Sequence, residues 1–147
     1  MSSIQDRLRS LGITLPPVGT PSAAYVPFVR TGNLVFVSGN IARKPDGSSW
    51  VGQLGAGTSL AEGQQAARTV AVQLLGALQA ATGDLARVKR VVKLLALVNS
   101  TATFTEQHLV ANGCSELIVE VLGKDVGSHA RSAFGVAQLP LGACVEI

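Results

Sequence analysis

The chain has 147 residues, of which 47% are hydrophobic and only 14% are charged, and its formal net charge is +3. A chain of this length is typical of one domain, so we predict a single domain over residues 1–147, and no apolar run is long enough to span a membrane. A typical soluble domain has about 25% charged residues, so the low charge predicts that a partner covers part of the surface. Residues 1–7 lack the apolar run of a secretory signal, which makes the cytoplasm the expected location.

Residues 1–24 are predicted to form a short helix followed by an extended connector. Ser3 is a suitable N-cap, and Gly12 comes directly after Leu11, where we expect the helix to end. Segment 15–21 contains three prolines, which exclude a helix because proline lacks an amide hydrogen and restricts the residue before it.

A hairpin is predicted next. The strand-like runs 25–30 and 34–38 are separated by Thr31-Gly32-Asn33, a sequence typical of a tight turn between antiparallel strands. A further turn is expected at residues 44–47, followed by a short strand at 50–51.

Two amphipathic helices are predicted from capping signals. Ser59 and Glu62 form a capping-box pattern, an apolar stripe follows it, and Gly83 marks the end of this helix. Thr103 and the glutamate three residues later repeat the pattern, so we expect the second helix to begin there, with a possible interruption at Gly113.

Strands are expected at 88–98, 132–139 and 143–147, which makes the chain an α+β protein with two helices on one face of a sheet. Segment 94–98 is apolar without alternation, as in strands that are covered on both faces. The sequence supplies no second layer for the other face. We therefore expect another copy of the chain to cover it.

Two charged residues are candidates for chemistry. Arg131, at the start of a strand, could present its planar guanidinium to a carboxylate, although an ordinary surface arginine is the alternative. Glu146 lies between two apolar residues, where a raised pKa would suit proton transfer, and an outward-pointing residue of an alternating strand is the alternative. Cys114 and Cys144 have no metal-ligand spacing, so we expect buried, reduced thiols and no metal. Without a basic stripe and interleaved aromatics, nucleic acid is not an expected partner.

Several segments resemble one known family. Gly32-Asn-Leu-Val-Phe-Val-Ser-Gly-Asn40, Arg131-Ser-Ala-Phe-Gly-Val-Ala-Gln-Leu-Pro140 and Val145-Glu-Ile147 are similar to sequences of the Rid family, also called YjgF or reactive-intermediate/imine deaminases, and labelled endoribonuclease L-PSP in older descriptions. The segments 11–16 and 110–115, together with His129, resemble a longer subgroup of that family.

The resemblance implies a chorismate-mutase-like fold, assembled as a homotrimer with clefts between subunits. It also implies hydrolysis of 2-aminoacrylate and related enamines or imines to 2-keto acids and ammonia, without a cofactor. By position, Arg131 would bind the carboxylate of a small substrate and Glu146 would orient the attacking water, while Tyr25 and Ser38 would line the cleft.

The sequence departs from the family at two positions. Ala133 stands where cysteine is common, and His108 stands where many members have asparagine, so that His108 could also face the cleft. A non-catalytic carboxylate-binding or regulatory protein using the same cleft is therefore the alternative function. Ribonuclease activity is a third and disfavoured function, because a basic stripe and paired histidines are lacking.

Overall fold

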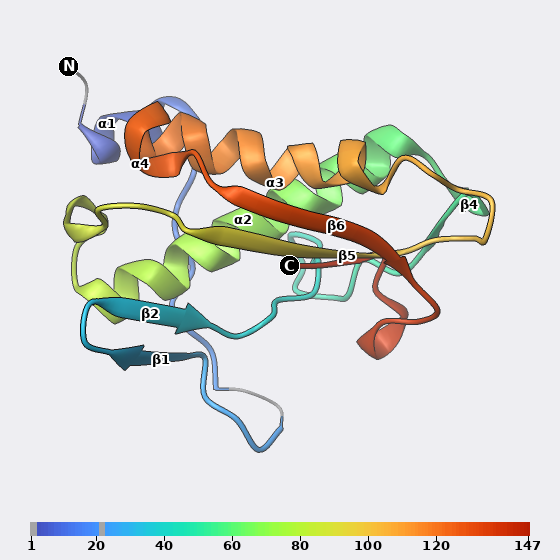
Figure 1. Cartoon of the computed structure of the whole chain (residues 1–147), viewed down its shortest axis with the longest axis horizontal. Helices are drawn as coiled ribbons and strands as arrows, with labels where there is room; N and C mark the ends of the chain where they lie inside the picture. The colour runs from blue at the N-terminus through green and yellow to red at the C-terminus, as the bar shows by residue number, and fades with distance from the viewer. Residues whose placement is uncertain (1–2, 21–22) are drawn as a thin grey trace.

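The computed structural model describes residues 3–20 and 23–147. The helices are α1 (Ile4–Ser10), α2 (Leu60–Thr82), α3 (Gln107–Leu122) and α4 (Lys124–Gly127), with single 3-10 turns η1 (Leu85–Arg87) and η2 (Pro140–Gly142) (Figure 1). The strands are β1 (Phe28–Thr31), β2 (Leu34–Val37), β3 (Gln53–Leu54), β4 (Gly57–Thr58), β5 (Lys93–Asn99), β6 (Ala130–Val136) and β7 (Val145–Glu146). Over the described part of the chain, no helix has the length and apolarity needed to cross a membrane.

The main sheet is built around β5. Strand β6 pairs with it in parallel on one side, and β7 pairs antiparallel on the other. The β1–β2 hairpin is antiparallel, and the segment after β2 continues along β7. There the amide of Asn40 donates to the carbonyl of Ile147 (2.8 Å), and the amide of Ala42 donates to that of Val145 (2.9 Å). These bonds join the hairpin to the larger sheet.

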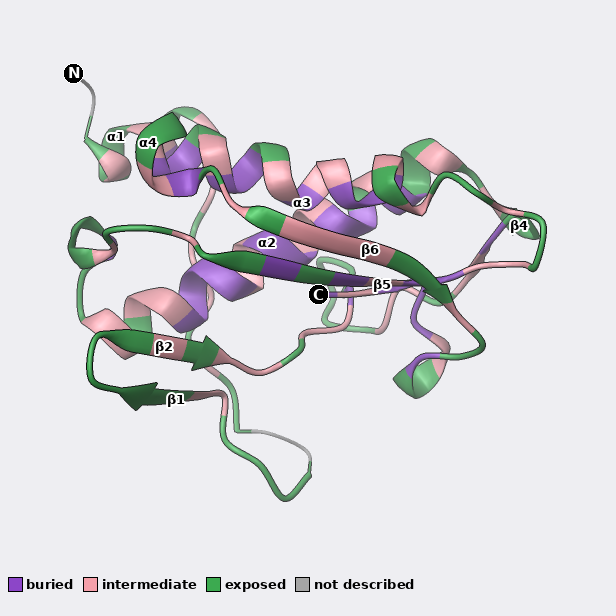
Figure 2. Cartoon of the chain, viewed as in Figure 1, coloured by how far each residue is buried: buried purple, intermediate pink, exposed green. Residues whose placement is uncertain are grey.

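Both long helices cover the same face of the sheet, as predicted. Helix α2 contacts β2 and β7, and α3 contacts β5 and β6. Figure 1 shows α2 passing behind the strands, and Figure 2 shows its sheet-facing side buried while the hairpin is largely exposed. Along β5 the side chains of Leu94, Ala96 and Val98 are buried, whereas Leu95, between them, is 50% exposed. In a single chain, therefore, the second face of β5 remains open.

The N-cap predicted at Ser3 and the capping box predicted at Ser59 both form. Ser3 caps α1, and Ser59 exchanges hydrogen bonds with Glu62 at the start of α2. Helix α2 ends at Gly83, whose φ of +78° is a conformation that glycine adopts without a steric penalty.

The predicted start of α3 at Thr103 is wrong, because the helix begins at Gln107. A turn precedes it, in which the amide of Phe104 donates to the carbonyl of Thr101. The side-chain amide of Gln107 then donates to the carbonyl of Phe104 (2.7 Å), and residue 106 makes no side-chain capping bond. This local turn takes the place of the expected capping box.

Strand boundaries also differ from those predicted. The predicted strand 88–98 spans Lys93–Asn99 instead, and before it the amide of Val91 donates to the carbonyl of Val126 rather than to a strand. The hairpin begins at Phe28, the predicted strand 132–139 spans 130–136 instead, and 143–147 shortens to Val145–Glu146. The short strand predicted at 50–51 is reduced to an isolated bridge between Val51 and Ala143.

Gly113 does not interrupt α3; it lets α3 approach α2 closely. A Cβ at this position would clash with the main-chain carbonyl of Gln64 on α2. Nearby, Gly63 of α2 leaves room for the side chains of Leu54 and of Val110 on α3. The small residues on both helices bring their backbones together and thereby set the position of α3 over the sheet.

We predict that Gly113→Ala lowers the free energy of unfolding by about 1–3 kcal/mol, because the methyl group meets a backbone atom that can move only with its helix. In an open helix the same change would stabilise by about 1 kcal/mol, so the sign of the effect is diagnostic. Gly19→Ala is the matched control, since nothing lies within 4 Å of a Cβ there. Urea denaturation measures both, and a Gly113→Ala protein as stable as wild type would contradict the close packing.

Candidate functional site

The guanidinium of Arg131 is fixed by hydrogen bonds to α3. Its Nη1 donates to Asn112 Oδ1 (2.9 Å) and to Ser115 Oγ (3.0 Å), and its Nη2 donates to the main-chain carbonyl of His108 (3.0 Å). Positions 108, 112 and 115 lie on one face of the helix because they are spaced by four and three residues. Arg131 reaches them because it pairs with Leu94, whose buried side chain faces the helices.

The charge of Arg131 has no carboxylate partner among the residues that the structure describes. The ion pairs found there join Arg9 to Asp6 and Arg68 to Glu120. The acceptors around Arg131 are an amide, a hydroxyl and a carbonyl, which are all neutral. A guanidinium has five N–H donors, of which these groups accept three. The arrangement thus holds a half-buried cation in place and leaves its charge available to an anion.

Glu146 lies on the opposite face of the sheet from Arg131. Leu97 of β5 pairs with both Phe134 of β6 and Glu146 of β7, so these residues share a face. Arg131 is three positions from Phe134, and side chains alternate along a strand, so it points to the other face. Within one chain the two residues expected to carry the chemistry are therefore separated by the sheet.

The carboxyl group of Glu146 sits over Gly39, just after β2. A Cβ at position 39 would overlap Oε1 of Glu146, so a side chain there would displace the carboxyl group from this position. Partial burial raises the pKa of Glu146, because removing water from the carboxylate penalises its charged form. A group of this kind exchanges protons nearer to neutral pH than an exposed glutamate does.

Ser38 and Tyr25 belong to the same region as Glu146. The hydroxyl of Ser38 donates to the carbonyl of Val26 (2.6 Å), and its amide donates to that of Pro27 (3.0 Å). Ser38, Gly39 and Tyr25 line a cavity of about 640 Å³ between the N-terminal connector, the end of β2 and α2. Glu146 is not among the residues that line this cavity, and its carboxyl group reaches the cavity's edge only at Gly39.

His108 and Ala133 lie on the Arg131 side instead. The imidazole of His108 is exposed, and the group that contacts Arg131 is its main-chain carbonyl. Ala133 follows Arg131 by two positions and so shares its face, where it pairs with Ala96 and packs against the core.

Three residues of the Arg131 cluster were not identified as site residues from the sequence: Asn112, Ser115 and His129. The imidazole of His129 contacts the carbonyl of Gly127 through Nδ1 (2.6 Å) and Ser115 Oγ through Nε2 (3.0 Å). The signal that could have found them is their spacing. Asn112 and Ser115 are three apart on a helix, and His129 precedes Arg131 by two in an extended segment, so each pair shares a side.

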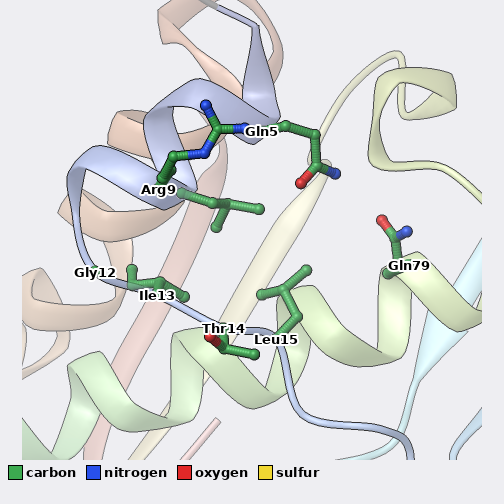
Figure 3. A pocket seen from close by; sticks show the side chains of 8 residues that line it. Gln5, Arg9, Gly12, Ile13, Thr14, Leu15 and Gln79 are labelled. Atoms are coloured by element: carbon green, nitrogen blue, oxygen red, sulfur yellow. The ribbon is translucent and has the colours of Figure 1, made fainter.

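A second cavity, of about 580 Å³, lies between α1 and α2. Side chains of Gln5 and Arg9 from α1 and Gln79 from α2 border it (Figure 3). No carboxylate, histidine or cysteine is among the residues that line it.

The residues that could bind a metal ion or act as thiol nucleophiles are few and scattered in the described part of the chain. Residues 3–20 and 23–147 contain no cluster of three or more His, Cys, Asp and Glu side chains that could hold a metal ion. Cys114 and Cys144 are buried free thiols, as predicted. Burial raises the pKa of Cys114 to about 12 and that of Cys144 to about 11, so both stay protonated at neutral pH.

The chain is similar in sequence and in fold to several known proteins. Protein TCP17 from Trypanosoma cruzi is 53% identical over 144 residues, which are 98% of this chain and 90% of that protein. A solved structure of a protein of unknown function from Agrobacterium tumefaciens is 46% identical, with a TM-score of 0.87 over 97% of this chain and 88% of that one. Another, from Shewanella oneidensis and described as a "putative endoribonuclease", is 27% identical, with a TM-score of 0.91 over 99% and 95% of the two chains.

Residues 5–147 match the model of the family described as "YjgF/chorismate_mutase-like, putative endoribonuclease". The match covers nearly the whole chain and includes Arg131 and Glu146. The resemblance seen in the sequence motifs and the α+β architecture is thereby confirmed, and the chain belongs to the YjgF/chorismate-mutase-like family.

Proposed function

We propose that the protein is an imine and enamine deaminase, which hydrolyses 2-aminoacrylate-type intermediates to 2-keto acids and ammonia. The observation that carries this proposal is the fixed guanidinium of Arg131, whose charge the described residues leave uncompensated. A planar, pre-oriented cation is suited to the two oxygens of a substrate carboxylate.

The reaction needs only positioning and proton transfer. The enamine first takes a proton on carbon to give the 2-imino acid, whose C=N carbon is electrophilic. Water adds to this carbon, and Glu146 accepts a proton from the water as the C–O bond forms. Glu146 passes this proton to the nitrogen, which has received the C=N π electrons. The new hydroxyl group then gives its own proton to the nitrogen as the C–N bond breaks, so that ammonia leaves and the carbonyl forms. Placement and general acid–base catalysis are sufficient for such a step.

The proposal requires a site between subunits. Arg131 and Glu146 are on opposite faces of the sheet in one chain, so we propose that one protomer supplies the guanidinium and another supplies the carboxylate. The open face of the sheet supports assembly, because it exposes the large apolar side chains Val29, Phe36, Leu95 and Phe134. Contiguous exposed apolar side chains often mark a surface that contacts another protein. A homotrimer with its sheets facing inward, as the family resemblance implies, would cover this face.

One observation favours a second candidate, a carboxylate-binding protein without turnover. Ala133, on the same face as Arg131, offers no side-chain polar group where the family commonly has a thiol. Such a protein would use the same guanidinium and the same intersubunit cleft. Turnover therefore distinguishes the two functions, while binding does not.

We predict that Arg131→Ala lowers kcat/KM for a 2-imino acid by roughly 100-fold or more, since a charge-assisted, two-point contact is lost. Arg131→Lys keeps the charge but not the planar fork, so it should also be impaired. Arg68→Ala, whose partner Glu120 is exposed on α3, is the matched control and should behave as wild type. An amino-acid oxidase generates the substrate, and release of ammonia and keto acid is followed; equal rates for wild type and Arg131→Ala would refute the role. Binding of 2-keto acids in calorimetry without turnover would favour the second candidate.

The rate is predicted to fall with decreasing pH through the raised pKa of Glu146, because a protonated carboxyl group cannot accept a proton from water. Glu146→Gln should lose about 100-fold or more in rate and should lack this acidic limb. Rates between pH 4 and pH 8 measure both effects. An unchanged profile in the Glu146→Gln protein would exclude this residue as the proton acceptor.

The same pKa predicts an opposite effect on stability. A carboxyl group whose pKa is raised by folding stabilises the fold at low pH, and this stabilisation is lost as the pH rises through the raised value. Glu146→Gln, which stays uncharged, should therefore have a higher Tm than wild type at pH 7, with the difference vanishing near about pH 4. Thermal denaturation across this range provides the measurement, and equal Tm values at pH 7 would contradict the dehydrated setting of Glu146.

Light scattering should give three times the 15.1 kDa chain mass. Leu95→Lys, on the open face, is predicted to give a smaller, folded and inactive species, because it places a charge at the covered apolar surface. Gln65→Lys adds the same charge on the exposed side of α2 and should remain trimeric and active. A wild-type protein that is monomeric and active would refute a site formed between subunits.

A further inference from the structure

We propose that Asn112, Ser115 and His129 are positioning residues, which fix the orientation of Arg131 and keep its charge uncompensated for a carboxylate ligand. The inference rests on the proposed function as far as the ligand is concerned. The positioning itself rests on the hydrogen bonds that these residues make.

The hydrogen bonds around His129 have a defined direction. The carbonyl of Gly127 can only accept, so Nδ1 of His129 carries the hydrogen of this 2.6 Å contact. In the neutral imidazole Nε2 is then an acceptor, and the hydroxyl of Ser115 donates to it over 3.0 Å. With its hydrogen so directed, Ser115 Oγ turns its lone pairs to Nη1 of Arg131, also 3.0 Å away. His129 thus sets the orientation of the hydroxyl, and the hydroxyl helps to set that of the guanidinium.

Asn112 completes the arrangement. Its Oδ1 accepts the second hydrogen of Nη1, so both hydrogens on this nitrogen are engaged by α3. Nη2 gives one hydrogen to the carbonyl of His108. The donors of Arg131 that no described residue accepts are the Nε hydrogen and the second Nη2 hydrogen. These belong to two adjacent nitrogens, which can bind the two oxygens of one carboxylate.

The chemistry of the three acceptors is informative. An arginine with a purely structural role gains most from a carboxylate partner, which neutralises it and accepts two hydrogen bonds. Here an amide, a hydroxyl and a main-chain carbonyl fix the side chain without neutralising it. The cluster therefore fixes the position of the Arg131 guanidinium without neutralising its charge, whereas an ion pair would do both.

This difference provides the test. Asn112→Asp keeps the acceptor at this position but adds a negative charge beside Arg131. We expect its Tm to be equal to or above that of wild type, because an ion pair replaces a neutral hydrogen bond. Its affinity for pyruvate, measured by calorimetry, should fall by roughly tenfold or more, because the charge is cancelled. Asn33→Asp, in the exposed hairpin turn, is the matched control and should bind as wild type. An Asn112→Asp protein that binds pyruvate as tightly as wild type would overturn the inference.

A second measurement does not depend on the ligand. In ¹⁵N NMR spectra the neutral form of His129 should carry its hydrogen on Nδ1, and the Nε–H signal of Arg131 should be sharp and slow to exchange. Ser115→Ala should broaden or abolish the Arg131 signal, and Ser115→Thr, which keeps the hydroxyl, should restore it. A hydrogen on Nε2 of neutral His129, or an Arg131 signal unaffected by Ser115→Ala, would overturn the positioning role. If the NMR results are as expected but wild type binds no pyruvate, the positioning role is supported and the proposed function fails.

Discussion

The site depends on one set of contacts, those between the guanidinium of Arg131 and one face of α3. Three neutral acceptors on this helix hold the cation, so any change in the distance between α3 and β6 changes its position. That distance is set by the core, because α3 rests against the backbone of α2 at Gly113 and both helices lie on the same sheet. A glycine without a side chain thus takes part in placing the guanidinium of Arg131.

The elements that could be predicted from the sequence are those whose signals are local. Ser59 and Glu62 contact each other three residues apart, and α2 begins where they indicate. The prediction from Thr103 fails because a competing local turn, bonded through Gln107, is formed there. Gly113 was predicted as a possible interruption of α3, but it is the point where α3 packs closely on α2. Only the position of α2 shows this.

The site shows the same division. Arg131 and Glu146 were identified by residue type and by the motifs around them, but their placement on opposite faces depends on the register of β6, β5 and β7. The sequence did not identify three residues of the Arg131 cluster: Asn112, Ser115 and His129. Their contacts with Arg131 depend on how α3 packs against β6, which the sequence alone does not show. Similarity to known proteins does not identify these residues either. A chain that is only 27% identical has a TM-score of 0.91, so the fold tolerates wide sequence change, and function must be argued from the site.

The short strand β7 has a consequence for how the molecule is made. It lies between the hairpin and β5, bonded to residues 40 and 42 on one side and to residues 97 and 98 on the other. The hairpin leaves the ribosome early, yet the segment that joins it to the central strand is synthesised more than a hundred residues later. Pairing over such a sequence separation is slow, because a long loop must close first. The hairpin and the central strand therefore become parts of one sheet only once β7 has been synthesised.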